Sequence, residues 1–245
     1  MRVCGLTDIG CRRQDNQDSW TIRHLEGGAV LLVVCDGMGG AQAGSVASSV
    51  AVEAFTAAVE EALAGGVPED PALREWTLAA ACREANGAVY RLSRERREYE
   101  GMGTTLVAAL VRSGSACLVH VGDSRAYILE NNAIHQVTVD HSFVQMLVER
   151  GEITADEARV HPQKNLITRA LGVDQQVECD VTRVEPAEGS RLLLCSDGLT
   201  NVLPDPVLLQ TSLEEREPEA LCRRLVDMTL EQGAPDNVTV VLAQL

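Results

Sequence analysis

Four aspartates stand in sequence contexts that could together hold two divalent metal ions: Asp18, Asp36, Asp197 and Asp236. Three of them border apolar runs with the pattern of buried strands. Asp36 and Asp197 each follow such a run, and Asp236 precedes another. A sheet can bring carboxylates at strand ends together, and hard oxygen ligands suit Mg²⁺ or Mn²⁺ better than zinc. The sequence therefore predicts a metal centre suited to phosphate chemistry.

Asp36 is the predicted bridge between the two metals, because Gly37 beside it lets a backbone carbonyl reach one of them. Two bridged metals lower the pKa of a shared water and clamp the phosphoryl oxygens during in-line displacement. Taken alone, each of these aspartate motifs indicates an ordinary turn. The hypothesis depends on all four occurring together and in this order.

The strands and helices that must position these residues occur in groups along the sequence rather than in strict βαβ alternation. This order favours antiparallel sheets with helices packed outside, and we expect one domain over residues 1–245. The expected strand regions are 3–10, 18–36, 104–112, 116–121, 125–130, 133–137, 178–184, 191–195 and 238–242. The expected helices are 42–63, 71–98, 142–150 and 217–231.

Composition excludes several classes of protein. The formal net charge of −15 is unsuited to nucleic acid or an anionic membrane, because both require clustered cations. No apolar run is long enough for a signal peptide or a membrane span. The eight cysteines include no C-x-x-C pair, which argues against a zinc ribbon and for free thiols in a reducing cytoplasm. His24, His120 and His135 show no ligand spacing, and His141 is expected to make local hydrogen bonds.

Eight motifs in sequence order resemble those of a known family. They are Arg13-x-x-Asn16-Gln17-Asp18, Asp36-Gly37-Met38-Gly39-Gly40, Gly103-Thr104-Thr105, Val121-Gly122-Asp123-Ser124-Arg125-Ala126-Tyr127, Asp140-His141-Ser142, Leu166-Ile167-Thr168-Arg169-Ala170-Leu171-Gly172, Cys195-Ser196-Asp197-Gly198-Leu199-Thr200 and Asp236-Asn237-Val238-Thr239. The chain resembles the metal-dependent PPM family of serine/threonine protein phosphatases, the type 2C group, and most closely its bacterial branch. The resemblance covers essentially the whole chain.

The resemblance implies an α+β fold in α-β-β-α layers, an antiparallel β-sandwich flanked by helices. It implies that Asp36 bridges two metals, with the Gly37 carbonyl on one of them and Asp197 and Asp236 on the other. Asp18 would bind directly or through a water. Asp36 and Asp197 are therefore catalytic candidates.

Three further features follow from the same resemblance. Arg13 would be a catalytic residue that binds the substrate phosphate, in keeping with the bidentate match of guanidinium to phosphate oxygens. Asp123 matches the position of a third, weaker metal. Residues 142–172 match a mobile flap over the cleft that is thought to influence substrate choice.

The sequence departs from the family pattern at three positions. Met38 stands where animal members commonly carry a histidine proposed as general acid, and it has no proton to donate. Asn201 replaces an aspartate of some members and should weaken a third metal. Gln17 replaces an acidic residue of many relatives, which removes one negative charge near the metals.

The predicted activity is hydrolysis of phosphoserine and phosphothreonine in proteins by a metal-activated bridging water, with two Mn²⁺ or Mg²⁺ ions per site. The resemblance implies phosphoprotein partners and a cognate bacterial serine/threonine kinase, and we expect a cytoplasmic monomer. No cysteine begins a C-x₅-R loop, which argues against a cysteine nucleophile. Two alternatives stay open: a non-catalytic partner of a kinase, and a phosphatase for small phosphoesters.

Overall fold

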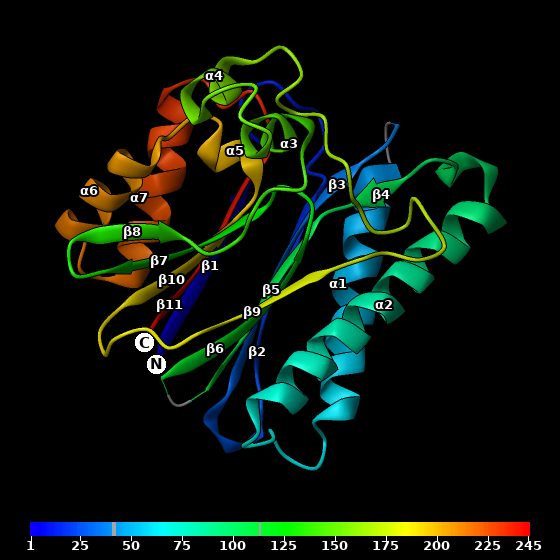
Figure 1. Ribbon diagram of the computed structural model, residues 1–245, viewed down its shortest axis with the longest axis horizontal. Helices are drawn as coiled ribbons and strands as arrows, with labels where there is room; N and C mark the ends of the chain where they lie inside the picture. Colours follow the sequence, from blue (N-terminus) through cyan, green and yellow to red (C-terminus); the bar gives the residue numbers. More distant parts are fainter. Residues whose placement is uncertain (41–42, 113) are drawn as a thin grey trace.

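Two antiparallel β-sheets face each other, and helices cover the outer face of each sheet (Figure 1). The structure is a computed structural model that describes residues 1–40, 43–112 and 114–245. One sheet has the strand order β1-β11-β10-β7-β8, and the other has the order β2-β3-β5-β6-β9 with β4 paired to β3. These layers confirm the predicted α+β sandwich.

The strands are β1 (Arg2–Asp8), β2 (Asp18–His24), β3 (Val30–Met38), β4 (Gly103–Thr104), β5 (Leu106–Arg112), β6 (Ser115–Val121), β7 (Arg125–Glu130), β8 (Ala133–Gln136), β9 (Asp180–Val184), β10 (Arg191–Cys195) and β11 (Val238–Gln244). The α-helices are α1 (Ala43–Ala62), α2 (Pro71–Glu95), α3 (Phe143–Glu149), α4 (Ala155–Val160), α5 (Asp197–Thr200), α6 (Asp205–Glu214) and α7 (Pro218–Glu231). Short 3₁₀ turns occupy η1 (Glu26–Gly28) and η2 (Arg97–Tyr99).

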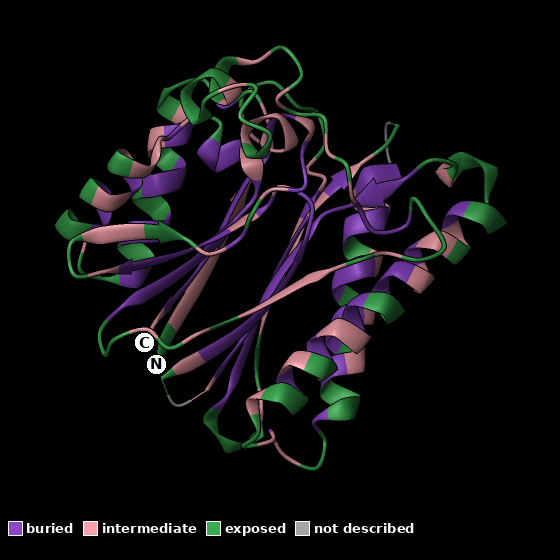
Figure 2. Cartoon of the chain, in the orientation of Figure 1, coloured by how far each residue is buried: buried purple, intermediate pink, exposed green. Residues whose placement is uncertain are grey.

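Strand β3 shows how the sandwich is filled, because its side chains alternate between two cores. Leu31 and Val33 pack with residues of α1 and α2, whereas Leu32 and Val34 pack against the facing sheet. A third core lies between the other sheet and helices α5, α6 and α7. Figure 2 shows the resulting buried band through both sheets. Each sheet is therefore apolar on both faces.

Local signals fix several element ends. Asp70 caps α2 by accepting a hydrogen bond from the Ala72 backbone N–H at 2.9 Å, with Pro71 in the first turn. Asn131 and Asn132 both have positive φ, at 50° and 58°, and form the turn between β7 and β8. The boundaries expected from these residues hold to within a few positions.

Sequence reasoning missed three helices and one break. The expected strand region 18–36 divides at η1 into β2 and β3. Helices α4, α5 and α6 were not predicted, and α5 begins at Asp197 itself rather than after it. Each is only 4 to 10 residues long, too short for a clear helical period. The predicted start of the first helix at residue 42 lies outside the described residues.

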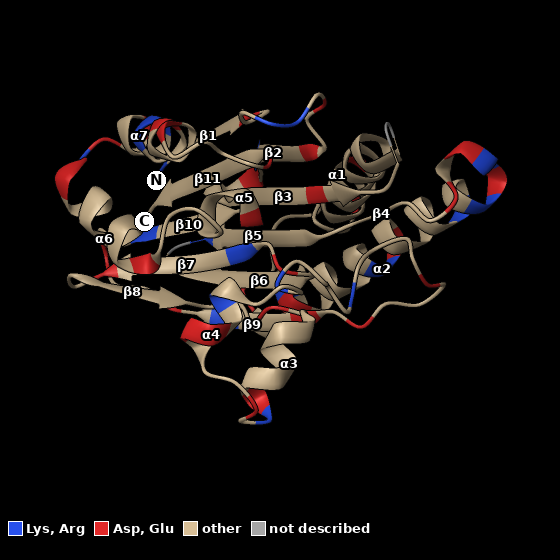
Figure 3. Cartoon of the chain, turned by 90° about the horizontal axis from the view of Figure 1, so that it is seen from above, with Lys and Arg blue, Asp and Glu red and all other residues tan. Residues whose placement is uncertain are grey.

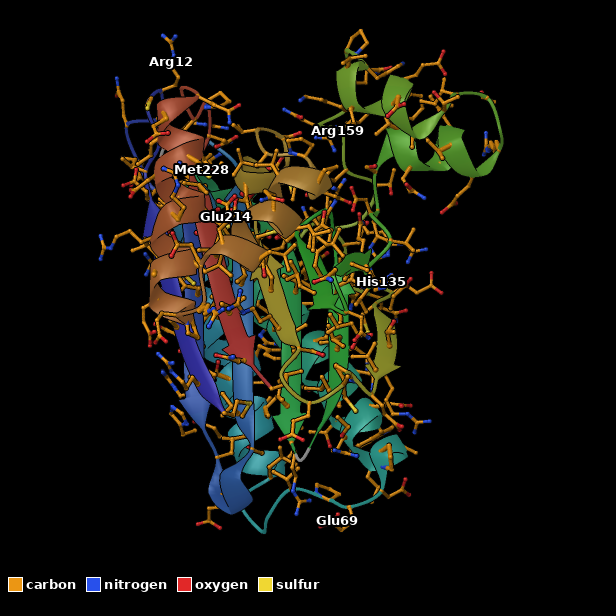
Figure 4. The ribbon with its side chains drawn as sticks, turned by 90° about the vertical axis from the view of Figure 1, so that its left-hand side faces the viewer. Arg12, Glu69, His135, Arg159, Glu214 and Met228 are labelled. Carbon is orange, nitrogen blue, oxygen red and sulfur yellow. The ribbon has the colours of Figure 1, made fainter. Side chains whose placement is uncertain are left out.

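The segment 142–172 carries α3 and α4 and projects from the end of the sandwich (Figure 4). Ser142 caps α3, and Thr154 forms a reciprocal capping box with Glu157 in α4. In the described part of the chain, no helix combines the length and apolar character needed to cross a membrane.

Candidate metal and phosphate site

The register of β2 and β3 places Asp18 directly opposite Asp36. In the other sheet, the Ser196 backbone N–H donates to the Thr239 carbonyl at 3.1 Å where β10 ends and β11 begins. The side-chain hydroxyls of these two residues form hydrogen bonds to Asp18 in the facing sheet. Ser196 Oγ and Thr239 Oγ1 donate to Asp18 Oδ2 at 2.7 and 2.6 Å. Hydrogen bonds to Asp18 thus join the two sheets at this end.

A cavity of about 220 Å³ opens beside this junction. Figure 3 shows acidic residues at the neighbouring ends of β2 and β3 and beside α5. The residues that line the cavity are Arg13, Gln17, Asp36, Gly37, Met38, Gly39, Thr105, Asp123, Asn165, Ile167, Asp197 and Asp236. Every predicted site residue except Asp18 is in this lining, and Asp18 lies behind Asp36 in the neighbouring strand.

Burial, together with the charges of neighbouring carboxylates, raises the pKa values of the aspartates at this site. Burial raises the pKa of Asp18 to about 7, although hydrogen bonds from Thr239 and Ser196 oppose the shift. Burial and the charge of Asp236 raise the pKa of Asp197 to about 6. Burial, with the charges of Asp18 and Asp197, raises the pKa of Asp36 well above its usual range.

Asp123, in the turn between β6 and β7, belongs to the same electrostatic group. Burial and the charges of Asp197 and Asp140 hold its pKa well above the usual range. Each of these shifts shows that the protein surroundings disfavour the ionised carboxylate, and a bound cation would reverse that preference.

The donor set fits hard divalent cations. Asp18 Oδ1 is buried and has no hydrogen-bond partner among the described residues. An unpaired buried carboxylate oxygen is costly unless something else satisfies it. The aspartates of the cavity suit Mg²⁺ or Mn²⁺, which prefer carboxylate, carbonyl and water ligands.

Glycines let backbone segments meet closely around the carboxylates. A Cβ atom at Gly37 would collide with the Gly44 carbonyl oxygen, and one at Gly198 would collide with the Asn237 carbonyl oxygen. The Gly37 backbone N–H donates to the Gln17 carbonyl at 3.0 Å. Packing therefore requires the glycine in each of the two Asp-Gly pairs.

Arg13 reaches this cavity from the loop between β1 and β2. Its Nη2 donates to Asp236 Oδ2 at 2.6 Å, and its side chain is about half exposed. The hydrogen bond to Asp236 raises the pKa of Arg13, and the charges of Asp236, Asp36 and Asp197 add to this shift. Partial burial lowers the pKa by a smaller amount. The guanidinium is thus a positive group in the lining of the acidic cavity.

A family model described as protein phosphatase 2C matches residues 11–242. The chain belongs to this family. It is 40% identical over 245 residues to the serine/threonine protein phosphatase PstP of Mycobacterium tuberculosis, and the match covers 100% of this chain and 45% of PstP. The chain therefore spans less than half the length of that relative.

Two further likenesses extend over nearly the full length of both partners. The chain is 37% identical over 238 residues to the serine/threonine phosphatase stp of Listeria monocytogenes, covering 97% of this chain and 93% of stp. It matches a solved structure of the PstP catalytic domain in complex with two manganese ions at a TM-score of 0.85 and 39% identity, covering 99% and 97% of the two chains. The predicted family resemblance is confirmed.

In this protein phosphatase 2C member a larger cavity of about 490 Å³ adjoins the first, because Asp123 and Asp197 line both. Its other walls include residues of β7, β8, α3, α4, α5 and α6. Lys164 lines it, and the positive charge of Lys164 lowers the pKa of Asp197 against the larger effects of burial and Asp236. Arg159 of α4 donates to the Thr200 carbonyl at 3.3 Å, which joins the segment 142–172 to α5.

Sequence reasoning missed the role of Asn237 as a connector. Its Oδ1 accepts from the Gln17 backbone N–H at 2.9 Å, and its Nδ2 donates to the carbonyls of Ile9 and Asp15 at 2.9 and 3.0 Å. One side chain therefore orders the loop that carries Arg13. Its place in the Asp236-Asn237 motif was visible, but its partners lie more than 200 residues away.

Thr105 was also missed. Its Oγ1 accepts from the Asp36 backbone N–H at 2.9 Å, and its own backbone N–H donates to the Asp36 carbonyl at 2.8 Å. These two bonds fix the backbone of the predicted bridging residue. Asn201, considered as a third-metal ligand, donates instead through Nδ2 to Asp197 Oδ2 at 2.8 Å.

The histidines required one correction. His141 makes local hydrogen bonds as expected, because its Nδ1 accepts from the Gly122 backbone N–H at 3.1 Å. The absence of ligand spacing was misleading, however, since His120, His141 and Asp180 converge with possible ligand atoms within 4.8 Å of one another. Arg169 lies against this cluster, with Nη1 3.1 Å from Asp180 Oδ1 and 3.3 Å from His141 Nε2. A guanidinium thus supplies the positive charge there.

The metal-free protein should gain stability as the pH falls from about 8 to about 5. The folded-state pKa values of Asp18 (about 7) and Asp197 (about 6) lie above those of the unfolded chain, near about 4. Between the unfolded and the folded pKa values, the folded protein binds more protons than the unfolded chain. Protonation of Asp18 and Asp197 therefore stabilises the fold fully below the unfolded pKa, and this stabilisation is lost as the pH rises through the folded pKa. Urea unfolding in EDTA at both pH values measures the difference.

Asp18→Asn is the matched control, because it removes the buried charge and nearly keeps the shape. Its stability should vary less between the two pH values than that of the wild type. A wild-type protein that is clearly less stable at about pH 5 than at about pH 8 would contradict the assignment.

Proposed function

We propose that this chain hydrolyses phosphoserine and phosphothreonine in proteins and that it uses two Mn²⁺ or Mg²⁺ ions. The observation that carries the proposal is the convergence of five aspartates from distant segments at one end of the sandwich, with a buried, unpartnered oxygen on Asp18. Family membership supports it, as does the PstP catalytic domain, which was solved with two manganese ions.

We assign each predicted ligand a role in the proposed centre. Asp36 would bridge the two ions, with the Gly37 carbonyl on one of them and Asp197 and Asp236 on the other, while Asp18 would bind directly or through a water. When bound, the ions neutralise the phosphoryl oxygens and lower the pKa of the attacking water. Thr105 fixes the backbone of Asp36, and Gly37 permits the close approach of the Gly44 carbonyl.

Asp123 would hold a third ion more weakly than the first two are held. Asp123 lines both cavities. Asn201, which lines the larger cavity with it, carries no charge, and its amide group donates a hydrogen bond to Asp197. A site with fewer charged ligands binds a divalent cation less tightly. Mn²⁺ should therefore occupy this position only at higher concentrations.

Arg13 would bind the substrate phosphate. It contacts Asp236 through one amino group, and a guanidinium has five N–H donors in a fixed fork that matches phosphate oxygens. Met38 lines the same cavity and has no titratable proton, so another group must protonate the leaving alkoxide.

We also propose that residues 1–245 form one catalytic domain that acts as a cytoplasmic monomer on proteins phosphorylated by a cognate serine/threonine kinase. The full-length match to stp supports the single domain. The cavity of about 490 Å³ beside the carboxylates gives room for residues that flank a phosphorylated side chain. A net charge of −15 disfavours nucleic acid as a partner.

Asp36→Ala and Asp197→Ala should each lower Mn²⁺-dependent hydrolysis of a phosphothreonine peptide and of p-nitrophenyl phosphate by at least about 100-fold, because each removes a ligand from the proposed centre. EDTA should abolish wild-type activity, and Mn²⁺ should restore it. Asp227→Ala, an exposed aspartate on α7, is the control and should keep full activity.

Folded Asp36→Ala or Asp197→Ala protein with normal turnover would refute the proposed centre. If the wild type hydrolysed phosphorylated metabolites faster than the phosphothreonine peptide, its substrates would instead be small phosphoesters.

Arg13→Ala should raise KM for a phosphothreonine peptide by about 10-fold or more, because it removes a charge-assisted contact to phosphate. Arg12→Ala is the matched control, since the neighbouring Arg12 side chain is exposed and points away from the molecule (Figure 4). Steady-state kinetics in saturating Mn²⁺ measure both variants. Equal KM values for the two variants would exclude Arg13 from phosphate binding.

A further inference from the structure

Two thiols from opposite ends of the sequence meet on the outer face of the first sheet. Cys4 lies in β1 and Cys222 in α7, and their Sγ atoms are 2.9 Å apart although 218 positions separate them in the sequence. A disulfide requires a sulfur separation of about 2.0 Å, so closure needs a movement of roughly 1 Å. We propose that Cys4 and Cys222 form a reversible disulfide when a hydroperoxide oxidises the protein.

The close approach is imposed by regular elements on both sides. The β1 strand pairs with β11 over its full length, and Cys4 stands opposite Leu242. Cys222 is buried on the inner face of α7, within the core that this helix shares with the sheet. Ion pairs from Arg2 to Glu217 at 2.6 Å and to Glu219 at 3.0 Å bind the start of the same strand to the start of the same helix. The pair is therefore held face to face by the fold.

The two sulfurs differ in ways that suit a two-step oxidation. Cys4 is half-buried, whereas Cys222 is buried. A hydrogen bond from the Cys222 thiol lowers the pKa of Cys4, while the same contact and burial raise the pKa of Cys222. Cys4 is accordingly the more accessible thiol and the better thiolate, which makes it the first to react.

The chemistry balances with a hydroperoxide as the only oxidant. The Cys4 thiolate attacks one peroxide oxygen, so an S–O bond forms, the O–O bond breaks and hydroxide leaves. Cys222 gives up its proton and attacks the Cys4 sulfur, so the S–S bond forms and water leaves. With hydrogen peroxide, two thiols are oxidised by two electrons, one disulfide forms and two waters are released. Dithiothreitol reverses the change by thiol–disulfide exchange.

The bond would fasten α7, the helix that precedes Asp236 in the chain, to strand β1. This helix ends at Glu231, and the Ala234 carbonyl that follows accepts from the Cys11 backbone N–H at 2.9 Å. The disulfide would close a loop that covers most of the chain, and long closed loops restrict the unfolded ensemble most strongly. Oxidation should therefore stabilise the protein against unfolding.

Peptide mapping of the whole chain tests the proposal. Reduced protein in EDTA is treated with hydrogen peroxide, alkylated, digested without reductant and examined by mass spectrometry. We expect a cross-linked peptide pair that joins Cys4 to Cys222, lighter by two hydrogen atoms than the separate peptides and absent after dithiothreitol. Recovery of Cys4 and Cys222 as free thiols or as separate sulfinic acids overturns the proposal, as does a cross-link at other cysteines alone.

Thermal unfolding supplies an independent readout. Oxidised wild type should unfold at a Tm roughly 5 to 15 °C above that of the reduced protein. Cys4→Ser, at the half-buried position, should abolish both the cross-link and the shift. Cys11→Ser is the matched control, because Cys11 is an exposed free thiol whose sulfur donates a hydrogen bond to the Leu230 carbonyl at 3.7 Å. Should Cys4→Ser misfold when reduced, Cys4→Ala replaces it; a Tm shift that survives in either variant contradicts the proposal.

Discussion

Repulsion among buried carboxylates is the constraint on which the rest of this structure depends. Two unit charges about 4 Å apart interact by about 4 kcal/mol at an effective dielectric of about 20, and the aspartates at this site all carry the same sign. Burial and mutual repulsion raise the pKa values of Asp18, Asp36, Asp123 and Asp197. Such an arrangement costs stability in the metal-free protein, and bound divalent cations relieve that cost.

Hydrogen bonds hold Asp18 and the backbone of Asp36 in place despite this repulsion. Ser196 and Thr239 satisfy one oxygen of Asp18, and Thr105 holds the backbone of Asp36 from two sides. Asn237 ties the Arg13 loop to the start of β11. These contacts join strands from both sheets, so the geometry of the site is a property of the packed sandwich.

The fold class could be predicted because strands and helices occur in batches and the apolar runs are strong. Strands β7 and β10 were placed to the residue, at 125–130 and 191–195, whereas the break that separates β2 from β3 was missed. Helices α4 and α5 could not be found, because elements of 6 and 4 residues have too few positions to show a period. Local pattern predicts long elements well and short ones poorly.

The carboxylate set could be predicted only from the order of its motifs, because each motif alone indicates a turn. What sequence could not supply was contact between distant polar residues. Asn237 with Gln17, Ser196 with Asp18, and Cys4 with Cys222 are all pairs separated by more than 170 positions. No local periodicity encodes such contacts, which arise only when the two sheets pack.

Proton release on metal binding tests the central claim most directly. Calorimetric titration of metal-free protein with Mn²⁺ at about pH 6.5, in two buffers with different ionisation enthalpies, reports both affinity and protons exchanged. If repelled, partly protonated carboxylates form the centre, Mn²⁺ binds and displaces protons into the buffer. Mn²⁺ binding without proton release, or no binding at all, would contradict this account.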